Sequence, residues 1–598
     1  MTLGLLVGAF VYLQVLISQR EMLPVLVAYA FVAVAGLIAA AAQPSASPAP
    51  SSWCFVAAAV LCGYIVGRAL TSPVSYVARA DLYLVLAGFV VYAVVLTALS
   101  APARRAAIFV TLLLVALVHV AVAVAQVIRG GSLSLLVPAL QSFEQGEITG
   151  RGAGLYASPN HLAGMLELVG VLGLSLACWS RRPHWLRICI GYLAAACYVG
   201  VALTGSRGGY LGVAASILAF ACLSLLVLGA AGGRHVLKFG AIALVIASLG
   251  GLGLWTLVQQ NPTLSGKLQN IVTDPTRVTL WEAAIEQWKL QPWIGTGSGT
   301  YLFYGREFRA PTFQQDPVDV HNDYLHLLAE YGVAGAAAFL LFFLVHVGYG
   351  CRTFVALGIR RVAAGAPPLS DRLALNIGAL SCLAAYLVHS AVDFNMHIPA
   401  NALLIASIFG MLAAPGLTQD QTTLATVPRW TPRLGLTLAA AVLLIQCVRI
   451  LPGEYFADRA RIALWREDWE AAMNFGLEAL KREKQNPHIY FYLGRALRAS
   501  AGELSQWEER VPLYESALSA HTKAHRLSPL DATYLIDQAQ LYDILGRFEE
   551  AERMFALAKA RDPRAQYISD EYNAHQKLWR RSRTHSQPPA GERPPVGQ

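Results

Sequence analysis

The feature that most constrains this chain is a series of long apolar segments that fills its first three quarters. A helix of roughly 20 apolar residues crosses the hydrocarbon core of a bilayer, and inside that core the backbone must satisfy its own polar groups. We expect about thirteen membrane-spanning helices, at 2–18, 22–42, 52–70, 80–99, 106–128, 161–179, 185–203, 210–230, 238–258, 331–351, 373–391, 400–414 and 433–451. The predicted fold class is therefore all-α, with a polytopic membrane domain over residues 1–452.

Composition agrees with a membrane protein and argues against two other classes. Only 14% of the residues are charged, against about 25% in an average soluble domain. The formal net charge is +9, but the basic residues gather in short loops between spans, so we expect no nucleic-acid partner. The nine cysteines lie in or beside apolar spans without a CxxC pair, so neither a zinc site nor a disulfide framework is indicated.

The basic loops also predict the orientation, because loops rich in Lys and Arg stay in the cytoplasm. The loop after the tenth span carries four arginines, and alternating sides from there gives four further basic loops. Their residues are Arg352, Arg360, Arg361 and Arg372; Arg104 and Arg105; Arg181, Arg182 and Arg187; Arg234 and Lys238; Arg429 and Arg433. In a bacterial inner membrane, the segments 129–160, 204–209, 259–330 and 389–399 would then face the periplasm, together with the tail. The segment 259–330 is expected to form a large periplasmic loop.

The polar tail is predicted to be a small α-solenoid over residues 453–579. Tetratricopeptide repeats place small and aromatic residues at fixed offsets in a helix pair. The residues on those offsets are Ala539, Tyr542, Gly546, Ala551, Phe555, Ala558 and Pro563. A generic bundle of helical hairpins is the alternative. A solenoid of this kind would offer a groove to a protein partner, whereas the Pro-rich residues 580–598 are expected to be disordered.

Two polar clusters fall early on the predicted outer face. The first, RGAGLYASPNHLAG, contains Arg151 and also Asn160, which we expect to cap the following span; a plain loop with a helix cap is the alternative. The second, TGSRGGY, places Arg207 between small residues that let backbone N–H groups approach an anion. An arginine that snorkels to the interface is the alternative for Arg207.

A third cluster spans residues 274–301. An amphipathic helix is expected at 276–290, with Trp281, Ile285 and Trp288 resting at the membrane interface. Arg277 falls in its first turn, where a cation opposes the helix dipole, so this arginine suits an anionic ligand better than it suits the helix. The glycine cluster at 295–299 is only a weak indication of phosphate binding, because no strand precedes it.

The last two clusters are rich in histidine. His321 and Asn322 stand at the start of a helix, and His326 lies five residues after His321, which is not the spacing of a zinc pair on one helical face. The segment 389–399 supplies His389, Asp393, Asn395 and His397. A direct role in chemistry and a purely interhelical hydrogen-bonding role both remain open for this segment, and no metal ligand set is expected.

In this order the motifs resemble the O-antigen ligase and O-antigen polymerase superfamily. The resemblance rests on GRG…SPNH, TGSRGG, R…W…A…PWIGxG and HNxYL…ExGxxG, and it covers about residues 150–410. Its members move a glycan from an undecaprenyl diphosphate carrier to an acceptor on the periplasmic face, in assembling polysaccharides such as lipopolysaccharide. The family's functional residues would map onto Arg207, Arg277 and His321. The tetratricopeptide-like tail departs from the simplest ligases and leaves the acceptor open.

The resemblance agrees with the chemistry of these residues. A departing lipid diphosphate develops negative charge, which Arg207, Arg277 and Arg151 would bind through paired N–H donors. Histidine exchanges a proton near neutral pH, so His321 would accept or orient the proton of the acceptor hydroxyl. The residues Asn160, Asn322, His389, Asp393 and His397 are expected to support this site, and no cofactor is expected.

The partners expected are an undecaprenyl-diphosphate-linked glycan, a glycan, lipid or protein acceptor, and the membrane itself. Ligase, polymerase and protein O-oligosaccharyltransferase activities remain alternatives within the superfamily. A polysaccharide transporter or flippase, or a non-catalytic export scaffold, is a more distant alternative. A transporter is expected to carry its polar residues near mid-membrane, whereas these clusters gather at one edge.

Overall fold

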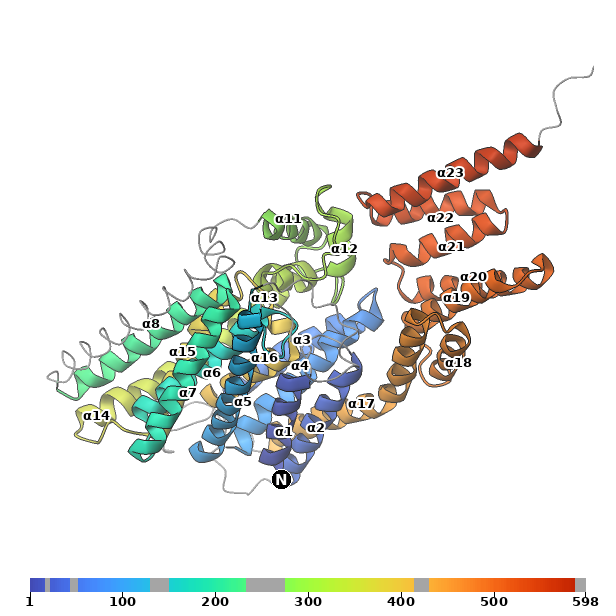
Figure 1. The fold of residues 1–598 in the computed structure, drawn as a ribbon. Coiled ribbons are helices and arrows are strands. Elements are labelled where there is room, and N and C mark those ends of the chain that lie inside the picture. Colours follow the sequence, from blue (N-terminus) through green and yellow to red (C-terminus); the bar gives the residue numbers. More distant parts are fainter. Residues whose placement is uncertain are drawn as a thin grey trace, which may run out of the picture.

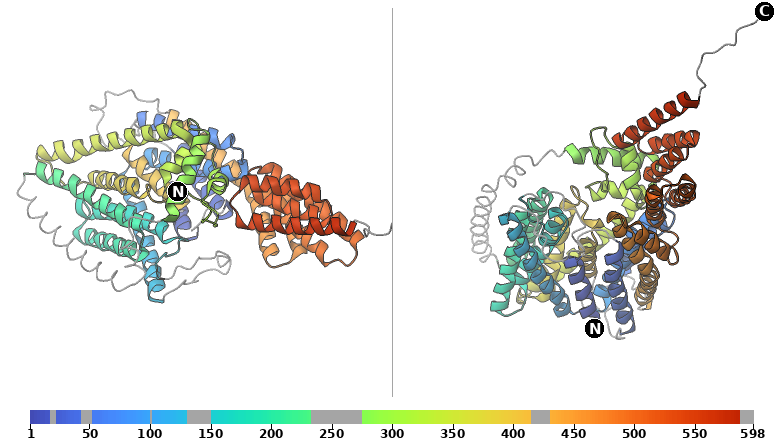
Figure 2. Two further views of the ribbon diagram at one scale, coloured as in Figure 1. Left: turned by 90° about the horizontal axis from the view of Figure 1, so that it is seen from above. Right: turned by 45° about the vertical axis from the view of Figure 1, so that its right-hand side comes forward.

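The computed structural model describes residues 1–16, 22–42, 52–99, 101–129, 150–232, 275–413 and 430–586. These residues form helices and connecting turns, with no strand among them. A bundle of long helices makes up most of the molecule, and helices α11 and α12 cover one of its ends (Figure 1). The C-terminal helices stand beside this same end, as Figure 2 shows. We call it the polar end, because it carries the turns at 150–158, 204–206 and 390–398.

Ten described helices are long and apolar enough to cross a membrane. They are α2 (Met22–Ala41), α3 (Ser52–Leu70), α4 (Ser75–Thr97), α5 (Pro102–Arg129), α6 (Pro159–Trp179), α7 (His184–Thr204), α8 (Arg207–Ala230), α13 (Asp323–Phe354, continued by η2, Val355–Arg360, and α14, Arg361–Ala363), α15 (Asp371–His389) and α17 (Trp430–Trp465). Helices α1 (Thr2–Leu16) and α16 (Pro399–Leu412) are apolar but shorter. The predicted span at 238–258 lies outside the described residues, so the count of thirteen remains a prediction.

Helices α6 and α15 lie at the centre of the bundle. In their most apolar 18-residue stretches, 83% of α6 and 78% of α15 is buried inside the protein, whereas only 17% of that stretch is buried in α8. The two central helices pack against each other, and Ser175 of α6 donates a hydrogen bond of 2.6 Å to the carbonyl of Ala374 in α15. Glu167 of α6 and His389 of α15, each 1% exposed, are therefore shielded from both lipid and water.

Arginines close the helix ends at the opposite end of the bundle. Arg105 donates to the carbonyl of Leu99 at 2.7 Å, just after the end of α4. Arg187 donates to the carbonyl of Cys178 at 2.7 Å, at the end of α6. The last carbonyls of a helix have no partner within it and favour a cation. These loop arginines therefore stabilise helix ends in addition to their predicted effect on orientation.

At the polar end, a glycine turn packs into a break in α13. Gly332 adopts a φ of +65° inside α13, and a Cβ there would lie 2.5 Å from the backbone nitrogen of Gly295. The two segments are joined by backbone hydrogen bonds, among them Thr296 N–H to the carbonyl of Ala329 at 3.1 Å. The glycines of the predicted GTGSG cluster therefore serve the close approach of two backbones. The turn leads into α12 (Tyr301–Phe308), and α11 (Pro275–Leu290) precedes it.

The C-terminal helices continue from the membrane helix without a break. Helix α17 runs through Pro452, across the predicted boundary between membrane domain and tail. The helices that follow are α18 (Trp469–Leu480), α19 (Pro487–Glu503), α20 (Trp507–Leu527), α21 (Ala532–Ile544), α22 (Phe548–Arg561) and α23 (Gln566–Ser586). They pack as successive neighbours, and their identity as tetratricopeptide repeats remains a prediction. Helix α23 overruns the start of the predicted disordered segment, so that prediction is wrong for residues 580–586; residues 587–598 lie outside the described chain.

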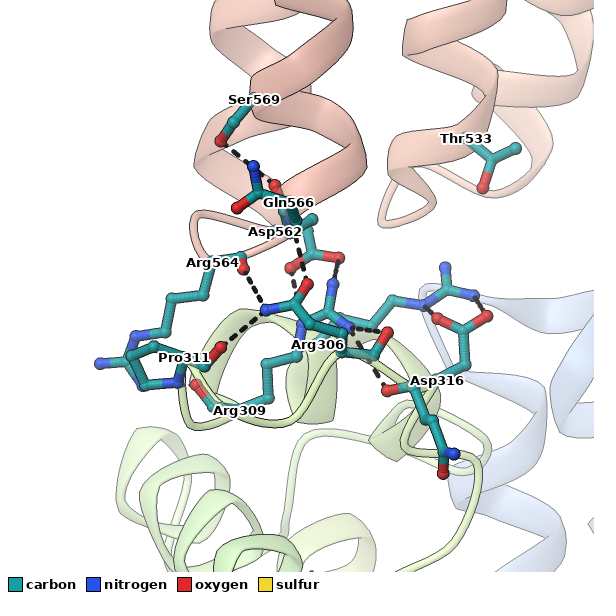
Figure 3. A network of polar contacts seen from close by, with 12 residues as sticks. Arg306, Arg309, Pro311, Asp316, Thr533, Asp562, Arg564, Gln566 and Ser569 are labelled. Atoms are coloured by element: carbon teal, nitrogen blue, oxygen red, sulfur yellow. Dashed lines mark hydrogen bonds and ion pairs between the residues drawn. The ribbon is translucent and has the colours of Figure 1, made fainter.

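Polar contacts at two places hold these C-terminal helices against the bundle. At their base, Tyr76 of α4 donates to Glu454 at 2.9 Å. At their far end, Arg309 forms an ion pair with Asp562, and the two side chains are 1% and 0% exposed (Figure 3). Since Arg309 follows α12 directly, the helical tail is docked on the segment that covers the polar end.

Candidate active site

The first part of the site is the turn that carries Arg151. Its backbone is held by Gln126 of α5, whose side-chain oxygen accepts the N–H groups of Ala153 and Gly154 at 2.8 and 2.9 Å. The Arg151 guanidinium donates to the carbonyl of Thr204 at 2.7 Å and to the side chain of Asn160 at 2.9 Å. Arg151 is therefore fixed between the start of α6 and the end of α7.

The prediction that Asn160 caps α6 is wrong, because Asn160 instead accepts a hydrogen bond from Arg151. Ser158, and not Asn160, is the N-cap residue of α6, and its hydroxyl accepts the N–H of Asn160 at 3.3 Å. The side chain of Asn160 is left to orient Arg151. The prediction that Asn160 supports the site thus depends on a contact different from the one expected.

The TGSRGG motif turns the chain from α7 into α8 and places Arg207 at the polar end. Gly205 has a φ of +59°, a left-handed conformation that glycine adopts without strain. Ser206 then caps α8 by accepting the N–H of Gly209 at 3.2 Å, and Arg207 is the first residue of the helix. Two further glycines in the helix touch other parts of the site: a Cβ on Gly208 would lie 2.5 Å from His389, and one on Gly212 would lie 2.2 Å from Glu167.

The centre of the site is the carboxylate of Asp393, which is 1% exposed. It receives Arg277 from the first turn of α11 at 3.6 Å and His321 Nδ1 at 3.5 Å. His389 Nε2 lies 3.8 Å from the same carboxylate. Burial alone would raise the pKa of Asp393, but hydrogen bonding to His321 and His389 and their charges hold it well below its usual range. Asp393 is therefore ionised at any working pH.

Arg151 lies within electrostatic reach of this carboxylate and of two other arginines. Burial lowers the pKa of Arg151 to about 10; the positive charges of Arg277 and Arg207 act in the same direction, and Asp393 acts against them. Arg151 is thus close enough to Asp393, Arg277 and Arg207 for their charges to act on it. Like charges so close together repel, and an anionic ligand would relieve that repulsion.

His321 is held in an unusual backbone conformation. Its φ is +53°, which costs a non-glycine residue energy and often marks a functional position. Trp281 of α11 donates to the His321 carbonyl at 3.3 Å, and the His321 ring lies edge-on to Phe394 at 4.6 Å. Trp281 therefore packs against His321, and the position of this helix at the membrane interface remains a prediction. Asn322 caps α13 by accepting the N–H groups of the next turn at 3.0 and 3.1 Å.

A buried acid–histidine pair stands behind Asp393. His389 Nδ1 lies 2.9 Å from Glu167 of α6, and the two side chains are 1% and 2% exposed. Glu167 is the only Asp, Glu, Lys or Arg residue in α6. A charge within an apolar span is expensive and marks a candidate functional residue, so the position of Glu167 in the sequence is itself a signal for this residue.

The segment 390–398 joins these groups to α13. The backbone N–H of Asp323 donates to the carbonyls of Ser390 and Asp393 at 2.8 and 3.1 Å. The Asp323 carboxylate in turn lies 3.2 Å from His397 Nδ1. His397 is thus placed beside Asp323.

The GTGSG turn does not offer its backbone to a ligand in the described structure. The Glu330 carboxylate accepts the N–H of Gly299 and that of Tyr301, both at 2.9 Å. A second acid, Asp81 of α4, accepts the hydroxyl of Ser298 at 2.6 Å. The weak indication of phosphate binding is therefore replaced by a structural role for this turn, with Glu330 as a residue that the sequence analysis missed.

The structure brings together Arg151, Arg207, Arg277, His321 and Asp393, with His389 behind them. Among the described residues, no group of three or more His, Cys, Asp or Glu side chains has the arrangement of a metal site. Asp316, which precedes His321 in the sequence, is held by Arg306 in a paired contact of 2.9 and 3.0 Å. The arrangement suits a negatively charged ligand beside a histidine.

Comparison with known proteins gives one informative likeness. Residues 192–340 match the family model described as O-antigen ligase. No curated protein matches. A thermophilic TPR protein from Thermus thermophilus is similar at 21% identity over 26% of this chain and 84% of that chain, with a TM-score of 0.20. The matched segment contains Arg207, Arg277 and His321, and it supports a function of the glycan ligase or polymerase type in a membrane protein.

Proposed function

We propose that this protein is a membrane glycosyltransferase that moves a glycan from an undecaprenyl diphosphate carrier to a hydroxyl group of an acceptor. The observation that supports the proposal is that Arg151 lies within electrostatic reach of Arg207, Arg277 and Asp393, and that the buried Asp393 carboxylate also pairs with Arg277. Among these four side chains, three positive charges outnumber one negative charge by two. That surplus suits a diphosphate, whose paired oxygens match the planar fork of a guanidinium.

The reaction is a substitution at the sugar carbon that carries the diphosphate. The acceptor oxygen forms a bond to that carbon while the bond from the carbon to the diphosphate oxygen breaks. The bonding electrons leave with the diphosphate, where Arg207 and Arg277 stabilise the developing charge. The acceptor proton passes to His321 and from there to water.

His321 is suited to the proton transfer by its position. Its side chain is 33% exposed, whereas Asp393 is 1% exposed, so a substrate hydroxyl reaches the histidine and not the acid. Asp393 lies near Nδ1 at 3.5 Å, which leaves Nε2 for the acceptor. A buried carboxylate on one imidazole nitrogen orients the ring and stabilises its protonated form. We therefore assign His321 as the base and Asp393 as the residue that positions it.

The proposed location of the site is the periplasmic face of a bacterial inner membrane. The predicted cytoplasmic arginines gather at the other end of the bundle, as Arg105 and Arg187 illustrate. Ligase, polymerase and protein O-glycosyltransferase reactions share this chemistry and differ in the acceptor. The C-terminal helices, docked beside the polar end, are proposed to bind a partner protein in tetratricopeptide fashion.

A transfer assay with purified full-length protein tests the proposal. The donor is an undecaprenyl-diphosphate-linked glycan, the acceptor is a membrane extract from a strain that lacks the protein, and EDTA is in excess. We expect release of undecaprenyl diphosphate together with glycan attached to an acceptor. His321→Ala should lose transfer while it keeps donor binding. Release of free glycan without an acceptor product, or movement of intact donor across a vesicle membrane, would contradict the proposed transfer.

A further inference from the structure

A cavity of about 200 Å³ lies between α3, α4, α13 and α16, with α15 at its edge. Its lining is almost entirely apolar. Asp81 and Tyr92 both line it from α4, and their separation along the helix corresponds to roughly 16 Å at 1.5 Å per residue. The cavity is therefore elongated along the helices and extends from the polar end into the membrane domain.

Small residues keep this cavity open along its walls, and rings close its deep end. A Cβ added to Gly88 would find Ala406 of the facing helix as its nearest neighbour, at 3.8 Å. At the deep end, the rings of Phe342 and Phe409 pack with centroids 4.5 Å apart, and Tyr92 bonds to His346 at 3.0 Å. The shape is a blind slot, which suits one hydrocarbon chain.

The shallow end of the cavity is acidic. Asp81 and Asp323 line it together with His397, and no Lys or Arg is among its lining residues in the described chain. Asp81 accepts the hydroxyl of Tyr331 at 2.9 Å, and Asp323 lies 3.2 Å from His397. Carboxylates accept hydrogen bonds from hydroxyl groups and repel phosphates. This end therefore suits an uncharged head group rich in hydroxyls.

The start of α13 at Asp323 and the adjoining segment 390–398 lie between the cavity and the arginines of the site. Asp323 lines the cavity, and its backbone N–H donates to the carbonyl of Asp393 at 3.1 Å. The Asp393 carboxylate receives Arg277 and His321. None of the three arginines of the site lines the cavity. A molecule with its chain in the slot would thus present its head group beside His321.

We infer that this cavity is the binding site for the hydrocarbon chain of the acceptor, and that the acceptor is a lipid with an uncharged, hydroxylated head group such as a glycolipid. The inference rests on the proposed function and specifies its acceptor. A chain already in a bilayer gains little from an apolar slot, because lipid tails are as apolar as the side chains that line it. Selection therefore depends on the acidic end, which excludes the diphosphate of the donor.

The test is photolabelling of the full-length protein in lipid nanodiscs with a dodecyl glucoside that carries a diazirine on its chain. We expect the label on peptides of α3, α4 and α16. Ala406→Phe, which fills the slot, should reduce labelling by tenfold or more. Ala439→Phe is the matched control, because Ala439 is also a partly buried alanine of a membrane helix and does not line the cavity. Gly88→Leu fills the slot from the facing helix if Ala406→Phe does not insert.

Competition by unlabelled lipids shows whether the slot binds the hydrocarbon chain of an acceptor, of the donor or of any lipid. Unlabelled dodecyl glucoside should displace the probe, whereas dodecyl phosphate and undecaprenyl diphosphate should be weaker competitors by tenfold or more. Equal competition by undecaprenyl diphosphate would assign the slot to the donor, and equal competition by dodecyl phosphate would make it a general lipid site. Either result would overturn the inference. Labelling that Ala406→Phe leaves unchanged would overturn it as well. Labelling requires no glycan transfer, so its failure leaves the proposed function standing, and a failure of transfer with intact labelling counts against the proposed function alone.

Discussion

The substitution Gly208→Ala tests whether the geometry behind the site matters to catalysis. Gly208 is buried in the first turn of α8, and an added Cβ would lie 2.5 Å from Cδ2 of His389. Ordinary contact begins at about 3.4 Å, so the ring or α8 must retreat by about 0.9 Å. His389 is fully enclosed and held by Glu167 at 2.9 Å, so the movement must displace the histidine or the neighbouring Arg207.

The expected losses of stability and of activity differ in size. Overpacking costs roughly 1–3 kcal/mol, and alanine regains up to about 1 kcal/mol over glycine in a helix. The net loss of about 0–2 kcal/mol should leave the protein inserted. A misplacement near 1 Å at a catalytic site costs about 10²-fold in rate, so we expect Gly208→Ala to lose transfer by about that factor. The assay is donor turnover by purified protein, with thermal unfolding measured in parallel.

Gly229→Ala is the matched control in the same helix, because nothing lies within 4 Å of a Cβ at that position. It should keep full activity. A fully active Gly208→Ala variant, or an equal loss in the Gly229→Ala variant, would refute the argument that the helix glycines serve the site.

Two further predictions concern buried charges. Arg309→Ala leaves the Asp562 carboxylate buried without its cation, which typically costs about 3–5 kcal/mol, so hydrogen exchange should become faster in α22. The control Lys481→Ala removes an exposed ion pair and should leave that exchange unchanged. Unchanged protection of α22 in the Arg309 variant would argue against the docking contact. Glu167→Gln keeps the shape but removes the charge beside His389, and the weaker hydrogen bond should lower kcat by roughly tenfold with little change in the donor KM. Unchanged kcat in that variant would show that the pair is only structural.

Much of the candidate site was predictable from residue types at unusual places in the sequence. Arg207 and Arg277 stood out because a positive charge opposes local preference at both positions. The structure places both beside Arg151. Asp393 was expected only as a supporting residue, because hydrophobic periodicity says nothing about which loop side chains meet in space. Its central position depends on α11, α13 and the 390–398 segment packing together.

Other parts could not be predicted, because they depend on contacts between distant segments. Glycine clusters are ambiguous in a sequence: the GTGSG turn serves close backbone packing against Gly332, and the N–H groups of Gly299 and Tyr301 are bound by Glu330. Amphipathic periodicity predicted α11 but not its orientation, and Trp281 turns toward His321. The described helices agree with an all-α chain, whereas the number of spans and the orientation in the membrane remain predictions.

The way the helical tail is attached could not be predicted from the sequence either. Composition changes near residue 452, and the sequence favoured a separate domain there, but α17 is one helix across that point. The pair of Arg309 with Asp562 joins residues 253 positions apart, which no local pattern reveals. The tail is therefore attached to the segment above the site at a second place. Its removal would expose Arg309 and would change the surroundings of α12.

Binding of undecaprenyl diphosphate to the purified protein in excess EDTA tests the central claim most directly, because the claim is that arginines hold the donor diphosphate. We expect the protein to bind undecaprenyl diphosphate in preference to undecaprenyl monophosphate. Arg277→Lys and Arg207→Lys should each weaken that binding by tenfold or more, since lysine keeps one charge but loses the planar fork. Arg104→Lys, at an exposed arginine of the opposite end, should bind as the unmodified protein does. Equal affinity for the two lipids, or Arg277 and Arg207 variants that bind undecaprenyl diphosphate as tightly as the Arg104 variant, would contradict the account.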